Sequence, residues 1–378
     1  MENLDKNTRD FFLDKYLNVI DHVQILLSQN TEWKTKYSKY KNDIFASKNS
    51  LMLRQQQNLY YYTNFSDSIK TTDKKLYAQI RYRGQLVGKI CQTENISGKF
   101  EHILIIDKKD GEHNCKTFPG YQNVEELNGF AGKSSTLKCD WHNSKEAQAF
   151  RKFFKGSLKK GLKSNSQESR GEHTLESAFL TEIEKRDSIT KSLCYIQPVK
   201  LKNLRFQFPT GLSASKLHKD INKKNDIKHL SYSENGGGID ILARRKKGNQ
   251  SYLTVIELKD EYKEQEKPEI AIMQAIAYAT FIRELIRCDA ANSNANSSWY
   301  ALFGLNTKDL DKDLVIKCVV ALPDVKDPNL FSNAELPEIL IPDRNNQYKD
   351  KLLLHCINIE LQDGDKNKIT KLIPDKYF

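Results

Sequence analysis

Apolar side chains recur at helical spacing near the start of the chain. From Thr8 to Gln29 they return every three or four positions, which predicts an amphipathic helix. The polar, tyrosine-rich stretch from Trp33 to Tyr62 continues this character, although several Asn and Ser residues interrupt it. We therefore expect the chain to be helical up to about residue 70.

The pattern changes to alternation between Lys75 and Asp107. Apolar and polar residues alternate there on both sides of Gly84, as is typical of half-buried strands. The segment from Arg151 to Arg170 is strongly basic and contains Gly and Ser residues, which indicates a linker, either solvated or in contact with phosphates. We expect an N-terminal α+β domain over residues 1–165 and a second domain over residues 166–378.

Helix-like and strand-like segments alternate after residue 165, which indicates an α/β fold. Strands rich in Val, Ile and Leu lie between amphipathic or apolar helices there. The expected helices cover residues 172–186 and 270–286, and the expected strands cover residues 193–208, 239–243, 252–258, 315–321 and 352–361, the last of them at a sheet edge.

Composition narrows the class of protein. A chain of 378 residues has room for two domains, and 38% hydrophobic with 29% charged residues is typical of a globular protein. No apolar run approaches the roughly 18 to 20 residues of a membrane-spanning helix, and the first residues do not resemble a secretion signal. We expect a cytoplasmic protein without a membrane partner. The net charge of +11 favours polyanionic partners such as nucleic acid.

The seven cysteines are scattered and never form a CxxC pair, which argues against a disulfide framework. One arrangement offers four zinc-competent ligands at unusual spacing, namely His113-x-Cys115 followed by Cys139-x-x-His142. Isolated cysteines are more often small buried side chains. Structural zinc is therefore the minor alternative.

Two acidic residues are embedded in apolar segments of the second domain. Asp240 lies within the run Ile239–Ala243, and Glu257 ends an apolar run after a turn at Lys246–Asn249. An ionised carboxylate in such a strand loses several kcal/mol of solvation unless a cation or hydrogen bonds replace the water. A β-hairpin would place both acids on adjacent strands, where they can converge on one Mg²⁺ or Mn²⁺.

Lys259 follows Glu257 at the spacing that puts both side chains on one face of a strand, with Leu258 on the other. There the ammonium can orient an attacking water or neutralise charge on a phosphate, and the Leu258 carbonyl can add a metal ligand. The same acidic-x-Lys spacing also occurs in polar segments, such as Glu261 and Lys263. In those segments a solvated surface is the simpler interpretation.

This constellation resembles the PD-(D/E)xK nuclease superfamily, which includes restriction enzymes, RecB-like exonucleases and Holliday-junction resolvases. In that resemblance Asp240 is the first acid, and Glu257 and Lys259 are the second acid and the lysine. Gln274 and Tyr278, one turn apart on the predicted helix, match the QxxxY signature of RecB-like members. The proline that precedes the first acid in the family is absent.

The resemblance covers roughly residues 172–322 and implies a restriction endonuclease-like fold, a mixed sheet flanked by helices in the order αβββαβ. Glu176 resembles the acidic residue that many members carry on the helix opening this fold, with Glu182 as its competitor. The implied metal ligands are Asp240, Glu257, the Leu258 carbonyl and Glu176.

The implied activity is metal-dependent hydrolysis of phosphodiester bonds in nucleic acid, with DNA as the expected substrate. The basic run from Arg244 to Lys247 could contact phosphates or form a solvated turn. The N-terminal domain would select the substrate or a partner, and a homo-oligomer is not excluded. Alternatives are a non-catalytic nucleic-acid-binding module and a Mg²⁺-dependent phosphatase. Phage defence, repair and mobile-element roles all fit, and the preceding divergent domain favours defence.

Overall fold

The computed structural model describes residues 6–46, 59–63, 69–70, 75–94, 96–128, 136–156, 172–184, 196–200, 204–214, 230–233, 236–247, 250–259, 268–290, 295–323, 338–343, 347–362 and 365–373. The chain divides into two compact units. Unit 1 comprises Met1–Lys41, Ala178–Val199 and Gln207–Phe378, and unit 2 comprises Asn42–Ser177 and Lys200–Phe206. Within the described residues, no helix has the length and apolar character needed to cross a membrane.

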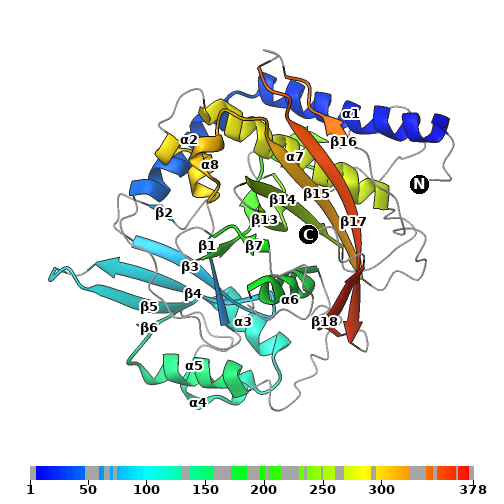
Figure 1. The fold of residues 1–378 in the computed structure, drawn as a ribbon. Coiled ribbons are helices and arrows are strands. Elements are labelled where there is room, and N and C mark those ends of the chain that lie inside the picture. The colour runs from blue at the N-terminus through cyan, green and yellow to red at the C-terminus, as the bar shows by residue number, and fades with distance from the viewer. Residues whose placement is uncertain are drawn as a thin grey trace. The chain divides into compact units, whose positions relative to one another are not determined.

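Unit 1 is built on a curled mixed sheet flanked by helices, as Figure 1 shows. Its strand order is β16-β17-β15-β14-β13-β7, with β18 added to β17. β14, β15 and β17 run parallel, whereas β13 is antiparallel to both of its neighbours. The strands are β7 (Ile196–Pro198), β13 (Ile241–Lys247), β14 (Gln250–Leu258), β15 (Val315–Pro323), β16 (Glu338–Leu340), β17 (Lys351–Gln362) and β18 (Asp365–Ile373).

Helix α7 (Pro268–Ala290) packs on β14, β15 and β17 of this sheet. Pro268 occupies its first position, where the missing N–H costs nothing, and nearly every described side chain from Ala271 to Ile286 is buried. Helix α1 (Lys6–Gln29) packs against α7 in turn. Because it is covered on several sides, α7 can be apolar around most of its circumference.

The start of the chain belongs to unit 1 rather than to the region that follows it in sequence. Helix α2 (Glu32–Ala46) brings Trp33 and Tyr37 against Phe281 of α7, with ring centroids 5.7 and 5.1 Å apart. Aromatic packing therefore joins α2 to the core of unit 1. Shorter elements complete this unit: α8 (Trp299–Leu302), η7 (Ala295–Ser297), η8 (Thr307–Asp309), β9 (Phe208–Pro209), β10 (Leu212–Ser213), β11 (Ser231–Tyr232) and β12 (Gly238–Ile239).

Unit 2 contains a second sheet, with the strand order β6-β5-β4-β3-β1-β8 and β2 added to β3. All pairings are antiparallel except that of β1 with β8. A buried aromatic cluster that includes Trp141, Phe150 and Phe154 forms its core. The strands are β1 (Leu59–Thr63), β2 (Ile69–Lys70), β3 (Lys75–Tyr82), β4 (Gln85–Glu94), β5 (Phe100–Ile106), β6 (Leu137–Asp140) and β8 (Arg205–Phe206). The helices are α3 (Lys108–Thr117), η2 (Tyr121–Asn123), α4 (Glu125–Asn128) and α5 (Lys145–Gly156), and α6 (Glu172–Glu184) begins in unit 2 and ends in unit 1.

Two expectations from the sequence are wrong. Residues 59–63 form strand β1 instead of extending a helix, because their backbone pairs with β3 and the tyrosines pack on a sheet. The strand expected at residues 352–361 is β17, and it lies inside the sheet, with β15 on one side and β16 and β18 on the other. The expected class, a mixed α/β fold with a sheet flanked by helices, is confirmed.

Candidate metal centre

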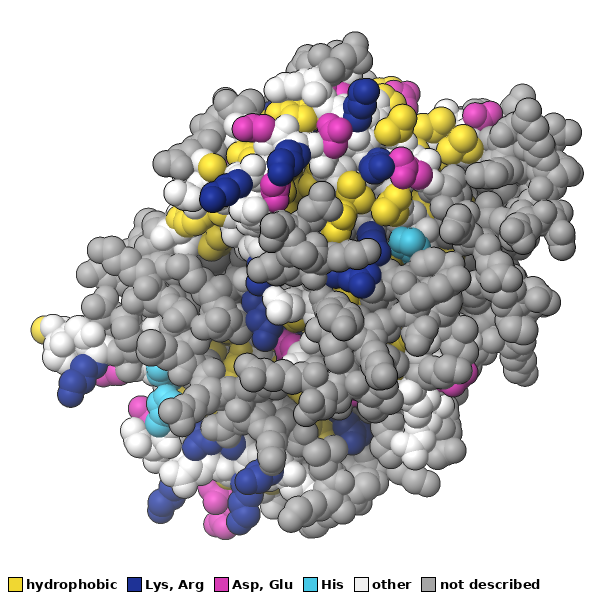
Figure 2. Space-filling model, in the orientation of Figure 1, with side chains coloured by type: hydrophobic (Ala, Val, Ile, Leu, Met, Phe, Trp, Pro, Cys, Tyr) yellow, Lys and Arg dark blue, Asp and Glu magenta, His cyan; other side chains and the backbone are white. Residues whose placement is uncertain are grey.

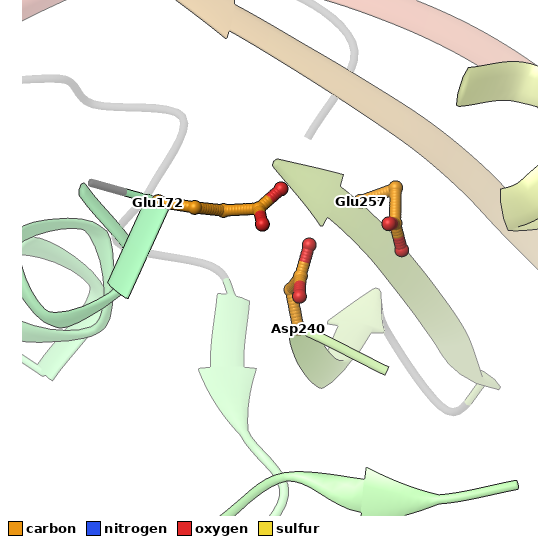
Figure 3. Close-up of side chains that lie close together, drawn as sticks. All are labelled: Glu172, Asp240 and Glu257. Carbon is orange, nitrogen blue, oxygen red and sulfur yellow. The ribbon is translucent and has the colours of Figure 1, made fainter. Parts of the chain in front are cut away.

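The hairpin of β13 and β14 brings Asp240 and Glu257 together. Ile241 pairs with Ile256, so Asp240 and Glu257 face each other at the next position. Asp240 occupies the bend between β12 and β13 rather than a strand, and Glu257 lies near the end of β14 (Figure 3). One carboxylate oxygen of each lies within 4.8 Å of the other. Glu257 is only 1% exposed and Asp240 is partly exposed, so the acidic pair has one dehydrated carboxylate and one that solvent can reach.

Asp240 is held in place by the backbone of β14. Its Oδ2 accepts a hydrogen bond from the Leu258 N–H at 2.8 Å. The Leu258 side chain is fully buried, so this part of the strand cannot shift without disturbing the core. The hydrogen bond fixes the orientation of the Asp240 carboxylate beside the Glu257–Leu258 peptide. Whether the Leu258 carbonyl binds metal stays a prediction.

Lys259 lies beside Glu257, as the alternation of side chains along a strand requires. The distance from Lys259 Nζ to Glu257 Oε1 is 3.0 Å, and the lysine side chain is 16% exposed. The Lys259 N–H donates to the Ala321 carbonyl of β15 at 3.1 Å, which ties the end of β14 to its parallel neighbour. The ammonium is thus positioned at the acidic pair by the sheet itself.

Gln274 and Tyr278 meet on α7, where Gln274 Nε2 donates to the Tyr278 hydroxyl at 3.4 Å. Burial raises the pKa of Tyr278, the charges of Glu257 and Asp240 raise it further, and the hydrogen bond from Gln274 only partly opposes them. The phenol therefore stays protonated at neutral pH. A hydroxyl that keeps its proton can act as a hydrogen-bond donor beside the acidic pair.

The glycine run before Asp240 makes room for Tyr278. A Cβ on Gly237 would lie 2.1 Å from the Tyr278 hydroxyl, far inside contact distance. The sequence suggested that Gly236–Gly238 leave space for a substrate strand. At Gly237 this space is taken by the protein's own tyrosine, so the glycine is needed for the backbone to pass α7.

Glu176 lies in a different environment from the acidic pair. It is 2% exposed, and its Oε2 lies 3.3 Å from His173 Nδ1, a contact that raises the pKa of His173. Burial raises the pKa of Tyr62 to about 12, Arg205 opposes this shift and Glu176 adds to it. These contacts all lie within unit 2, and none of them is to the acidic pair.

The basic candidates divide into two groups. Arg244 donates hydrogen bonds to the Gly304 carbonyl and to Gln197 Oε1. Its guanidinium group therefore stabilises the fold instead of being available to bind a phosphate. Arg245 also lies within β13, whereas the side chains of Lys246 and Lys247 are outside the described structure. On the face drawn in Figure 2, described Lys and Arg side chains are interspersed with Asp and Glu. Among the described side chains on this face, the positive charge does not gather into one patch.

The proposed Cys/His quartet is not a metal centre, because these four residues do not form a group of converging ligands in the described part of the chain. The acidic pair offers carboxylate oxygens, the ligands that hard cations such as Mg²⁺ and Mn²⁺ prefer. Its chemistry has to be inferred from these residues alone. Comparison of the chain with protein-family models, with characterised proteins and with solved structures gave no match.

Proposed function

We propose that the chain is a metal-dependent nuclease that hydrolyses phosphodiester bonds, with DNA as the first substrate to test. The observation that carries this proposal is the meeting of Asp240 and Glu257 at the end of an apolar hairpin, with Lys259 Nζ 3.0 Å from Glu257. Two carboxylates can hold a divalent cation, and an adjacent ammonium suits a reaction at an anionic phosphate.

The order of elements supports a restriction endonuclease-like fold. The αβββαβ order of that fold corresponds to α6, β7, β13, β14, α7 and β15. The strands β7, β13, β14 and β15 are consecutive neighbours in the unit 1 sheet. Between β7 and β13 in the sequence, the chain also forms short paired strands. These strands are additions to the αβββαβ order of elements. In this proposal Asp240, Glu257 and Lys259 take the roles of the family's first acid, second acid and lysine.

Glu176 and its competitor Glu182, the acidic residues that the sequence offered on α6, are left out of the ligand set that we propose. Glu176 is in contact with His173, with 3.3 Å between Oε2 and Nδ1. The proposal therefore rests on the two carboxylates of unit 1, those of Asp240 and Glu257, which have oxygens within 4.8 Å of each other.

In this proposal Asp240, Glu257 and the Leu258 carbonyl would hold Mg²⁺ or Mn²⁺. A bound divalent cation supplies Lewis-acid activation of a water and neutralises charge at the phosphate. Lys259 orients the attacking water and stabilises the negative charge that develops on the phosphate oxygens. Tyr278 keeps its proton and donates a hydrogen bond at the site, and Gln274 positions its hydroxyl.

Cleavage assays test this proposal. Labelled single-stranded DNA, linear and circular double-stranded DNA and RNA are incubated with Mg²⁺, Mn²⁺ or EDTA, using wild type, Glu257→Gln and the matched control Glu338→Gln. Glu338 is an exposed acid on β16 of the same unit. We expect metal-dependent cleavage that falls by about 10³-fold or more in Glu257→Gln and is unchanged in the control.

Cleavage that persists in EDTA or in Glu257→Gln would overturn the proposal. An inert wild type that binds nucleic acid as tightly as Glu257→Gln does would instead support a binding module without catalysis. Hydrolysis of small phosphate esters, with every polynucleotide left intact, would indicate a phosphatase.

A further inference from the structure

Two histidines that are distant in sequence meet at one side of the unit 2 sheet. His102 belongs to β5 and is 7% exposed, and His142 follows β6 and is exposed. His142 Nε2 lies 3.2 Å from His102 Nδ1, and the two rings are nearly perpendicular, at 86°. His142 was one member of the Cys/His quartet considered from the sequence, and the structure gives it a different partner.

The spacing of these two nitrogens suits a shared metal ion. A tetrahedral ion with metal–nitrogen bonds of about 2.0–2.1 Å separates two ligating nitrogens by about 3.3–3.4 Å. The observed 3.2 Å therefore requires only a small movement of the exposed ring. We propose that His102 Nδ1 and His142 Nε2 bind one divalent transition-metal ion of the zinc type, with its remaining positions open to water or to an external ligand.

The surroundings of His102 favour the form of imidazole that binds metal. A histidine that ligates through Nδ1 carries its proton on Nε2 and commonly donates it to a carbonyl oxygen. Gln92 lies directly opposite on β4, and among the described residues both its Oε1 and His102 Nε2 are buried without a hydrogen-bond partner. With Nδ1 on a metal, His102 Nε2 would donate to Gln92 Oε1, a hydrogen bond that the described structure does not contain.

The backbone around His142 is held by side chains on both sides. Asp140 Oδ1 accepts the N–H groups of His142 and Asn143, at 2.8 and 2.5 Å. Arg151 donates to the Trp141 carbonyl and, at 3.4 Å, to the His142 carbonyl. The negative charge of Asp140 favours a nearby cation and the guanidinium of Arg151 opposes it. With two protein ligands, we expect weaker binding than at a four-ligand structural zinc site.

Calorimetric titration of the full chain with Zn²⁺ tests the pair. The titration is run in the Glu257→Gln background, so that zinc bound at the acidic pair does not obscure the result. His142→Ala is the informative variant because His142 is exposed and its loss leaves the core intact, and His113→Ala on α3 is the matched control. We expect at least 10-fold weaker binding in His142→Ala and no change in His113→Ala.

A second readout uses Co²⁺, whose visible absorption reports tetrahedral nitrogen ligation. The absorption band should appear in the Glu257→Gln background and be lost when His142 is also replaced. Equal zinc affinity with and without His142, or no zinc binding at all, would overturn this proposal. Neither result would bear on cleavage by the acidic pair, because the two tests vary different residues.

Discussion

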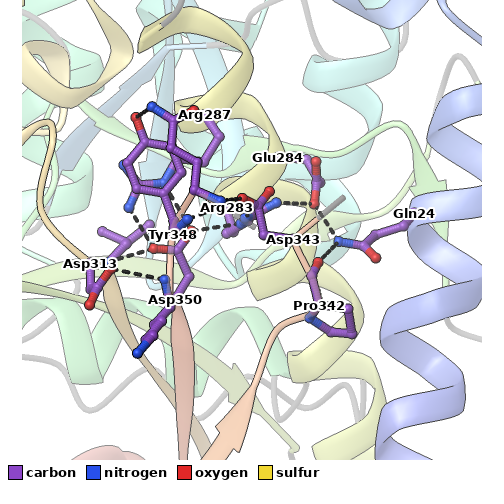
Figure 4. Close-up of polar contacts among 12 residues, drawn as sticks. Gln24, Arg283, Glu284, Arg287, Asp313, Pro342, Asp343, Tyr348 and Asp350 are labelled. Carbon is purple, nitrogen blue, oxygen red and sulfur yellow. Dashed lines mark hydrogen bonds and ion pairs between the residues drawn. The ribbon is translucent and has the colours of Figure 1, made fainter. Parts of the chain in front are cut away.

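Two clusters of buried charge among the described residues of unit 1 are paired differently. One is the acidic pair, in which two carboxylates have one lysine beside them. The other is an ion network in which Arg283 and Arg287 of α7 meet Asp350, as Figure 4 shows. The distances to Asp350 Oδ2 are 2.7 Å from Arg283 Nε and 2.9 Å from Arg287 Nε.

The ion network joins α7 to its surroundings. Asp350 is fully buried and also accepts a hydrogen bond from the Leu314 N–H at 2.7 Å. The guanidinium carbon of Arg287 lies over the Tyr348 ring, 3.5 Å from its centroid. Glu284 accepts from Arg283 and from Gln24 of α1, so the network extends to a second helix (Figure 4). In the ion network the carboxylates already accept hydrogen bonds from guanidinium groups, which fixes a particular packing. A pair of carboxylates with a single lysine beside it suits an external cation. The following variants distinguish these two roles.

Asp350→Asn should give the largest change in stability. It leaves two buried guanidinium groups without their shared carboxylate, which costs about 3–5 kcal/mol in the free energy of unfolding. Urea denaturation followed by circular dichroism measures this loss. Asp240→Asn should leave the free energy of unfolding of the metal-free protein nearly unchanged, because Asn can still accept the Leu258 N–H. Equal losses of unfolding free energy in Asp350→Asn and Asp240→Asn would contradict the distinction between a stabilising ion network and a metal-binding acidic pair.

Lys259→Ala should lower cleavage rather than stability. Without an ammonium to orient water and stabilise phosphate charge, we expect a fall of about 10²–10³-fold in kcat and little change in metal affinity. Single-turnover cleavage and metal titration measure the two quantities separately. Lys351→Ala, which removes a partly exposed lysine of β17, is the control. A parallel loss of metal affinity in Lys259→Ala would show that the lysine serves the ligands instead of the reaction.

Gly237→Ala tests the packing that joins the acidic pair to α7. The added Cβ would clash with the Tyr278 hydroxyl and should destabilise the protein by about 1–3 kcal/mol. Tyr278→Phe alone should cost only about 0.5–1.5 kcal/mol, because it removes one hydrogen bond. The double variant Gly237→Ala/Tyr278→Phe should recover part of the loss. Strictly additive losses would mean that the two residues do not meet.

Acidification should give the smallest of these changes in stability. Burial would raise the pKa of Asp350, but Arg287, the Leu314 N–H and Arg283 outweigh it and hold the pKa below its ordinary value. A carboxyl with a depressed folded-state pKa stabilises the fold above its unfolded pKa of about 3.9 and loses that contribution as pH falls through the folded pKa. Denaturation midpoints measured from pH 7 to pH 2 should therefore fall less steeply in Asp350→Asn than in wild type. Identical slopes would exclude Asp350 as a source of the pH dependence.

Local patterns predicted the parts of unit 1 that surround the acidic pair. The hairpin of β13 and β14 and the helix α7 follow from apolar periodicity, and alternation along one strand put Lys259 beside Glu257. All of these depend on residues that are close in sequence or joined by one short turn. The sequence was therefore sufficient to predict that Asp240, Glu257 and Lys259 lie close together.

Features that depend on distant pairing could not be predicted in the same way. Strand β1 exists because it pairs with β3, and without that partner its tyrosines fit a helix as well as a strand. Arg244 appeared available for phosphate until the fold brought the Gly304 carbonyl to it. His102 and His142 are similarly joined only by the register of β5 and β6. Each of these contacts joins segments that are distant in sequence, and the spacing of apolar residues within one segment does not predict which other segment it will contact.

The most direct test of the central claim is a Mg²⁺ and Mn²⁺ titration of wild type and Asp240→Asn, followed by denaturation in urea with and without metal. A cation that binds only the folded acidic pair should raise the free energy of unfolding of wild type by about 2.7 kcal/mol at 100 times its Kd. Asp240→Asn should lose this gain and keep its stability without metal. If both proteins respond equally to metal, or neither responds, Asp240 and Glu257 are not a metal centre.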